Sequence, residues 1–152
     1  MGKLTRAIEA KFTFLDSPPL IYYIEEHPTF QGAATEFFEA LDNGAARGGT
    51  SVLTLVEVLT KPLRDGNLDI ARKYREVLLG AVGISLLPIN ESIYSRAAQL
   101  RAKYRWLKTP DALQVESALL HRADLMVTND DRWKQFTEIT VLLLKEFVGT
   151  SP

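Results

Sequence analysis

The sequence predicts an α/β fold in which helices cover both faces of a mainly parallel central sheet. Short apolar segments of strand length alternate along the chain with longer segments of helical spacing. Strands that alternate with helices form βαβ units, and such units build a parallel sheet between two helical layers. The chain has 152 residues, of which 46% are hydrophobic and 24% charged, with no repeat or long linker. We therefore expect one domain over residues 1–152, with residues 1–11 as either an N-terminal arm or an extra helix.

The N-terminal part of the chain predicts one strand and two helices. Residues 12–15, Phe-Thr-Phe-Leu, predict the first strand. Ser17 suits the N-cap of a helix and Pro18 its first residue, so a helix through residues 20–26 should follow. Apolar side chains at helical spacing predict the next helix, over residues 30–41.

The middle of the chain adds two strands and two helical segments. Residues 51–53 predict a short second strand that runs directly into a helical segment at 54–60. Residues 68–81 keep one apolar face at helical spacing, and Asn67 suits the N-cap of this helix. An apolar run at residues 84–87 predicts the third strand.

The last part of the chain completes the sheet. Apolar spacing predicts a helix over residues 93–104, and a Thr-Pro pair at 109–110 opens a further helix that reaches about residue 121. Apolar runs at 125–128 and 141–144 predict the fourth and fifth strands. In a parallel sheet of this kind, ligands bind at the carboxyl ends of the strands.

Composition narrows the classes of function. The net charge of −1 gives no overall argument for nucleic-acid binding, so such an argument has to come from local patches. The chain has no cysteine and only two histidines, His27 and His121, which argues against disulfides and a zinc site. Any metal would be bound by oxygen atoms. The N-terminus does not resemble a signal peptide and no apolar run reaches about 20 residues, so we expect a cytoplasmic protein.

Acidic residues recur where the predicted strands end and helices begin. Asp16 follows the first strand, Glu57 comes shortly after the second, and Asp130 and Asp131 follow the fourth, while Asp111 opens a helix. These positions should meet at one edge of a parallel sheet. Clustered carboxylates either hold protons or bind cations, and Mg²⁺ or Mn²⁺ prefers oxygen ligands. Together the acids indicate a site for one of these ions.

Each acid taken alone also has a structural explanation. Glu57 lies three residues after Thr54, which is the spacing of a capping box. Asp111 stands in a first helical turn, where the helix dipole favours a carboxylate. Asp16 can begin a turn, and one of the two acids after the fourth strand can be a helix cap or a solvated neighbour. The metal-site interpretation depends on all of them acting together.

Four segments of the chain carry a resemblance to a known family. The series FLDSPPLIYYIE, SVLTLVEVLTKPL, RWLKTPDALQVESAL and ADLMVTNDDRW resembles the PIN domain, particularly the VapC-type toxin ribonucleases of toxin–antitoxin modules. The resemblance extends from about Phe12 to Phe147. It implies a three-layer α/β/α domain that binds magnesium or manganese with carboxylates and cleaves RNA. It also implies a homodimer and a cognate antitoxin protein as partner.

The resemblance assigns roles to particular residues. It implies that the catalytic and metal-binding acids are Asp16, Glu57, Asp111 and Asp130, with Asp131 as a substitute or helper of Asp130. It also implies that the hydroxyls of Ser17 and Thr128 orient ligands or water. The chain departs from the family pattern at Pro18, where related chains often have an asparagine. Proline has no amide group to donate across the site, which puts the local geometry or the rate in doubt.

Cationic side chains flank the predicted acids on both sides. Arg105 and Lys108 precede the Asp111 helix, and Arg132 follows the fourth strand, so we expect these three to contact substrate phosphates. Trp106 and Trp133 lie in the same segments, and we expect both to pack in the core.

Three functions are compatible with the sequence. The leading hypothesis is a metal-dependent ribonuclease in which a water activated by magnesium or manganese attacks an RNA phosphodiester. The alternative is a catalytically degenerate PIN-like module that binds RNA or a protein, with Pro18 as the sign of a lost activity. A phosphatase with Asp16 as nucleophile is a third hypothesis. It is the weakest because it leaves Glu57 and Asp111 without a role.

Overall fold

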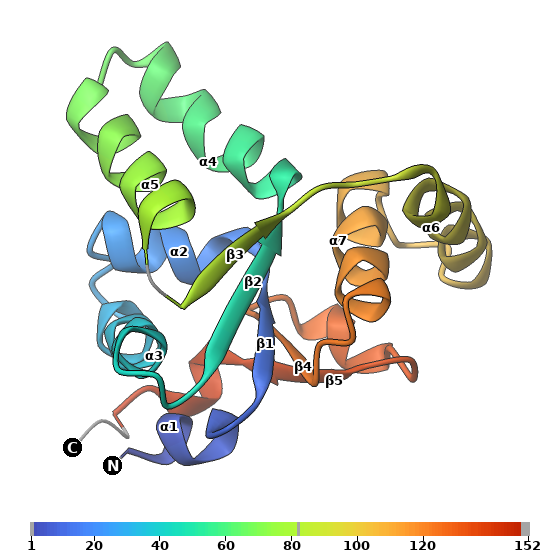
Figure 1. Cartoon of the computed structure of the whole chain (residues 1–152), viewed down its shortest axis with the longest axis horizontal. Coiled ribbons are helices and arrows are strands. Elements are labelled where there is room, and N and C mark those ends of the chain that lie inside the picture. Colours follow the sequence, from blue (N-terminus) through green and yellow to red (C-terminus); the bar gives the residue numbers. More distant parts are fainter. Residues whose placement is uncertain (1, 82, 150–152) are drawn as a thin grey trace.

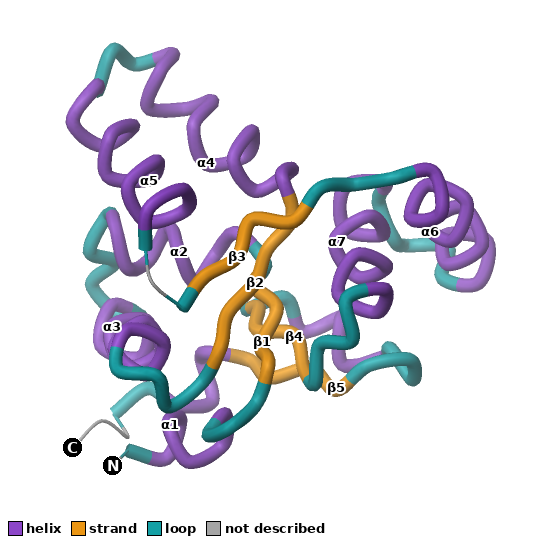
Figure 2. Tube along the Cα trace, in the orientation of Figure 1, coloured by secondary structure: helices purple, strands orange, loops and turns teal. Residues whose placement is uncertain are grey.

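A five-stranded sheet forms the centre of the molecule in a computed structural model that describes residues 2–81 and 83–149. The strand order is β3-β2-β1-β4-β5, and every neighbouring pair is parallel. The strands are β1 (Phe12–Leu15), β2 (Arg47–Ser51), β3 (Ile84–Leu87), β4 (Leu125–Thr128) and β5 (Thr140–Leu143). The predicted α/β fold with a parallel sheet is confirmed (Figures 1 and 2).

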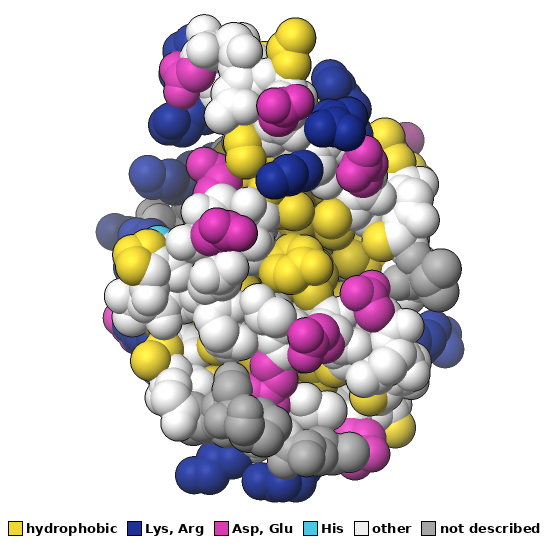
Figure 3. Space-filling model, turned by 90° about the vertical axis from the view of Figure 1, so that its left-hand side faces the viewer, with side chains coloured by type: hydrophobic (Ala, Val, Ile, Leu, Met, Phe, Trp, Pro, Cys, Tyr) yellow, Lys and Arg dark blue, Asp and Glu magenta, His cyan; other side chains and the backbone are white. Residues whose placement is uncertain are grey.

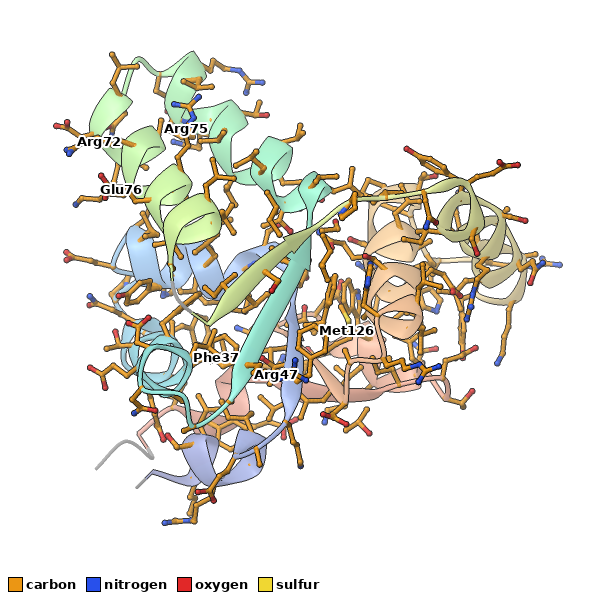
Figure 4. The ribbon with its side chains drawn as sticks, in the orientation of Figure 1. Phe37, Arg47, Arg72, Arg75, Glu76 and Met126 are labelled. Atoms are coloured by element: carbon orange, nitrogen blue, oxygen red, sulfur yellow. The ribbon has the colours of Figure 1, made fainter. Side chains whose placement is uncertain are left out.

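Helices cover both faces of this sheet and give three layers. They are α1 (Lys3–Ile8), α2 (Ser17–Ile24), α3 (Gln31–Asp42), α4 (Val52–Arg64), α5 (Leu68–Gly80), α6 (Glu91–Lys103) and α7 (Thr109–Leu120), with 3₁₀ turns η1 (Asp131–Gln135) and η2 (Leu144–Phe147). The helices α1 to α5 pack on one face around a core that includes Phe37. On the other face, α6 and α7 pack around a second core that includes Met126 (Figure 4). None of the helices described has the length and apolar character needed to span a membrane.

The second strand is the main error of the sequence prediction, because it covers Arg47–Ser51 rather than residues 51–53. Its Arg-Gly-Gly start has no apolar run, since the glycines are needed for space. A Cβ atom at Gly48 would lie 2.7 Å from the Leu41 side chain, and one at Gly49 would lie 2.8 Å from the Phe12 ring. The apolar residues that follow Ser51 begin α4 instead.

Most other boundaries agree with the prediction. β1, β3 and β4 have the predicted limits, β5 begins one residue earlier than expected, and Asn67 caps α5. The extra N-terminal helix exists as α1. The start of α2 differs by one residue, because Asp16 occupies the N-cap position and Ser17 is the first helical residue. α4 runs through Pro62 to Arg64, further than the predicted residue 60.

Candidate metal centre

Asp16 lies at the centre of the carboxyl edge of the sheet. It follows β1 directly, the residue is 7% exposed, and its side chain makes no capping bond to α2. Its Oδ2 accepts a hydrogen bond of 2.8 Å from Thr128 Oγ1, at the end of the neighbouring strand β4. Thr128 therefore orients the Asp16 carboxylate, as expected for one of the two predicted hydroxyls.

Glu57 is brought to Asp16 by α4, which begins where β2 ends. Ser17 Oγ donates a hydrogen bond of 2.5 Å to Glu57 Oε2, so the residue next to Asp16 orients the second acid. The capping-box explanation of Glu57 is wrong, because the N-cap of α4 is Ser51 and not Thr54. Ser51 Oγ accepts from the Leu53 amide at 3.2 Å. Glu57 thus lies in the second turn, where it has no capping role.

Asp111 enters from the other face of the sheet, in the first turn of α7. Burial raises the pKa of its carboxyl, and the charges of Glu57 and Asp130 raise it further. The cations of Arg132 and Lys108 lower the same pKa. The carboxylates brought by α4, α7 and the β4 end are therefore close enough to act on one another.

Asp130 and Asp131 have different environments. Asp130 accepts two hydrogen bonds from the Arg132 guanidinium, at 3.1 and 2.7 Å, and this contact lowers the pKa of its carboxyl. It also caps η1 by accepting from the Arg132 amide at 3.0 Å. The Asp131 side chain is 71% exposed and pairs with Lys145. The charge of Asp130 acts on the pKa of Asp111. A ligand role for Asp131 stays a prediction.

The site as a whole carries more negative charge than its protein neighbours offset. The pKa of Asp16 is raised to about 7, mainly by burial, and the charges of Asp111 and Glu57 add to the effect. Hydrogen bonds from Thr128 and from the Ser17 backbone act in the opposite direction but do not cancel it. A divalent cation would stabilise the ionised form of such a group of acids.

The donor set fits Mg²⁺ or Mn²⁺ bound partly through water. Among residues 2–81 and 83–149, no three acidic or histidine side chains converge closely enough to hold a cation by themselves. Asp130 is turned onto Arg132, and Glu57 onto Ser17. Mg²⁺ keeps several waters and commonly uses only one or two protein carboxylates, so convergence of three is not required.

Of the flanking basic and aromatic residues, one tryptophan is buried as expected and the other is not, and substrate contact by the cations stays a prediction. The Arg132 guanidinium lies 5.2 Å from the centre of the Trp106 ring as well as on Asp130. Arg105 and Lys108 are exposed. Trp133 is fully buried, as predicted, whereas Trp106 is only partly buried and packs beside Phe136.

Sequence reasoning missed four buried polar residues beneath the acids. They share a closed set of side-chain hydrogen bonds between β2, α4 and α7 and are all fully buried: Thr50, Ser51, Thr54 and Gln114. In the sequence, the feature that indicates this network is Gln114, a polar residue on the apolar face of the α7 segment.

The fold and the site together define a three-layer α/β/α protein with an acidic centre at the carboxyl edge of its sheet. The chain belongs to the PIN domain family, whose sequence model matches residues 13–139. The resemblance stated from the sequence is thereby confirmed. No curated protein sequence matches the chain.

Solved structures of the same fold include VapC-type proteins. VapBC2 from Rickettsia felis, bound to promoter DNA, shares 15% identity at a TM-score of 0.68, covering 87% of this chain and 98% of that one. A toxin–antitoxin complex from Klebsiella pneumoniae shares 22% identity at a TM-score of 0.67, covering 87% and 97%. VapC20 from Mycobacterium tuberculosis, a toxin that cleaves the sarcin–ricin loop, shares 14% identity at 0.67, covering 84% and 98%. At these identities the likeness concerns the fold.

Proposed function

We propose that this protein is a magnesium- or manganese-dependent endoribonuclease and the toxin of a toxin–antitoxin pair. The observation that carries the proposal is a group of four acids at the carboxyl edge of a PIN-domain sheet, Asp16, Glu57, Asp111 and Asp130. Glu57 and Asp111 act on the charge of Asp16, and Glu57 and Asp130 act on that of Asp111. Membership of the family and the fold of VapC-type toxins support the same assignment.

Different residues of the chain would have different roles in phosphodiester hydrolysis. Asp16, Glu57, Asp111 and Asp130 would hold the cation, while Ser17 and Thr128 keep the first two of these acids in place. A bound divalent cation supplies Lewis-acid chemistry, which activates water and stabilises negative charge at phosphate. Asp131 remains available as a helper, although its ion pair with Lys145 would have to open.

Cations beside the acids would bind the RNA backbone. Lys108 and Arg132 act on the charge of Asp111, so they lie close to where a phosphate would approach. Arg105 is exposed three residues before Lys108. Nucleic-acid affinity of this kind is mainly electrostatic, so we expect binding to weaken with salt. The action on RNA further implies that the protein works in the cytoplasm.

Apolar surface on the helices supports partner binding, both to an antitoxin and to a second copy of this chain. Leu55, Val56, Leu59 and Leu63 line a groove on α4, and Val56 and Leu63 are 64% and 45% exposed. Figure 3 shows apolar side chains gathered in a central hollow below the outer end of the α4–α5 hairpin. Exposed apolar surface of this type is typical of protein interfaces. Size exclusion at micromolar concentration should give a dimer, and a monomer would count against this part of the proposal.

One observation favours the alternative function, a degenerate module that binds RNA or a protein without cleaving. The Arg132 guanidinium already neutralises Asp130, as it would in a domain that had replaced its cation by an arginine. Pro18, at the position of the usual asparagine, points the same way.

RNA cleavage by the purified protein separates the two functions. A mixed RNA pool is incubated with Mg²⁺, Mn²⁺ or EDTA, beside Asp111→Asn and a matched control, Asp69→Asn, whose side chain is 86% exposed on α5. We expect cutting that needs either metal, is lost in Asp111→Asn and persists in Asp69→Asn. A folded, partner-free protein that leaves all RNA intact with both metals would overturn the nuclease in favour of the module.

A further inference from the structure

The buried polar network beneath the acids connects the elements that carry them. Gln114, on α7, is fully buried, and both ends of its amide are used. Its Oε1 accepts from Ser51 Oγ at 2.8 Å, and its Nε2 donates to Thr54 Oγ1 at 2.7 Å. Thr54 Oγ1 lies 2.7 Å from Thr50 Oγ1, which donates to the carbonyl oxygen of Leu15 at 2.9 Å.

The donor and the acceptor of each hydrogen bond from Leu15 to Gln114 can be assigned in only one way. Thr50 uses its single hydroxyl proton on the Leu15 carbonyl, so Thr54 must donate to Thr50. Thr54 can then only accept from Gln114, and this requires the amide nitrogen of Gln114 on that side. If the amide were turned over, the two threonine oxygens would face each other at 2.7 Å without a proton between them. The Leu15 carbonyl therefore fixes the direction of each hydrogen bond from Thr50 to Gln114, and with it the orientation of the Gln114 amide.

Members of the network lie close in sequence to three of the acids. Gln114 follows Asp111 by three residues on α7, and Thr54 precedes Glu57 by three residues on α4, so each pair shares a helix face. Leu15, the acceptor at the end of the network, immediately precedes Asp16. The elements that bring three of the acids together are thus joined by one rigid set of hydrogen bonds.

We infer that Gln114 is a positioning residue of the metal centre. By tying the first turn of α4 to α7 through Thr54, one helical turn from Glu57 and from Asp111, it fixes the separation of these two acids. It touches neither substrate nor cation and acts through Thr54 and Ser51. This role rests on the proposed function, since it matters only if these acids share a cation.

The test compares Gln114→Met with Val115→Ala. Methionine has nearly the length of glutamine but no amide, so it leaves Thr54 and Ser51 without their partner. Val115 is equally buried on the same helix but packs in the apolar core, so its truncation lowers stability without touching the network. We expect manganese affinity, measured by calorimetry, to fall about tenfold in Gln114→Met and to stay unchanged in Val115→Ala. RNA cleavage by Gln114→Met should recover as manganese is raised.

Crystal structures of both variants measure the separation of α4 and α7 directly, whether or not the protein binds metal. A shifted α4 in Gln114→Met alone is the expected result. Unchanged helix separation and wild-type manganese affinity in Gln114→Met would overturn the positioning role. If the wild-type protein binds no manganese and cuts no RNA, the proposed function fails, and the crystal structures then decide whether Gln114 sets this separation.

Discussion

Two polar regions lie one helical turn apart on α4 and α7, and they solve the problem of burying polar groups in opposite ways. The network of Thr50, Ser51, Thr54 and Gln114 is neutral and fully buried, and its hydroxyls and amide pair with one another. In the carboxylate region, the charges of Asp111 and Glu57 raise the pKa of Asp16, and those of Glu57 and Asp130 raise the pKa of Asp111. Asp16 is strongly buried, and among the residues described no cation forms an ion pair with it. A satisfied network rigidifies a fold, whereas unmatched charge costs stability. Buried groups that lower stability are found mainly at functional sites. The difference therefore indicates that the neutral network supports the fold and that the carboxylates form the functional site.

The largest effect is expected from neutralising the most buried acid. Asp16→Asn keeps an oxygen that can accept from Thr128 but removes the charge that would bind a cation. RNA cleavage should fall by at least about 100-fold, as when one preorganised electrostatic contact is lost. Initial cleavage rates of a defined RNA measure the loss, with Asp69→Asn as the control. A tenth or more of wild-type activity in Asp16→Asn would place Asp16 outside the site.

The stability of the metal-free protein should depend on pH through the same residue. Because the pKa of Asp16 is about 7 in the folded chain and 3.8 ordinarily, the unfolded chain releases this proton at lower pH. The contribution of Asp16 to the free energy of unfolding is therefore fully present below about pH 4. It is lost as the pH rises from there through 7. Between pH 5 and pH 8 the loss should be on the order of 3 kcal/mol. Urea unfolding in EDTA at pH 5 and pH 8 measures it.

The control for this pH effect is the same titration on Asp16→Asn. The variant should lack most of the decline and should be more stable than wild type at pH 8. Equal pH dependence in the two proteins would show that Asp16 is not the group responsible.

Breaking the neutral network should change stability by a smaller amount. The change should be a loss, whereas Asp16→Asn should raise stability at pH 8. Thr54→Val keeps the side-chain shape but removes the acceptor of Gln114 Nε2 and the hydroxyl that donates to Thr50 Oγ1. The free energy of unfolding should fall by about 2 kcal/mol. Thr60→Val is the matched control, because the Thr60 hydroxyl is on the exposed side of α4 and donates to the Val56 carbonyl of its own helix. Urea unfolding should show a change within about 0.5 kcal/mol for Thr60→Val; equal losses in both variants would contradict the assignment.

The smallest effect is expected at Asp131. Its ion pair with Lys145 is exposed, and exposed pairs contribute little to stability. Asp131→Asn should change the free energy of unfolding by less than about 0.5 kcal/mol and the cleavage rate by less than about threefold. Asp130→Asn, measured beside it, should lose much more activity. A reversed order of the two variants would make Asp131 the main acid.

The sequence predicted the carboxylate region far better than the network. Asp16 and Asp130 follow strands whose limits were read correctly from apolar runs, and strand ends in a parallel sheet share one edge. Glu57 was placed correctly although β2 was not, because the true strand begins with Arg-Gly-Gly and has no apolar signal. The network stayed hidden because its key contacts join residues 60 or more positions apart, and no local pattern reveals which hydroxyl meets Gln114.

Calorimetric titration with Mn²⁺ at pH 8 shows whether the carboxylates at the sheet edge form a cation site. The wild-type protein should bind manganese saturably, Asp111→Asn should bind at least about tenfold more weakly, and Asp69→Asn should match the wild type. A folded wild-type protein without saturable binding, or an Asp111→Asn variant that binds equally well, would show that these carboxylates do not form the proposed cation site.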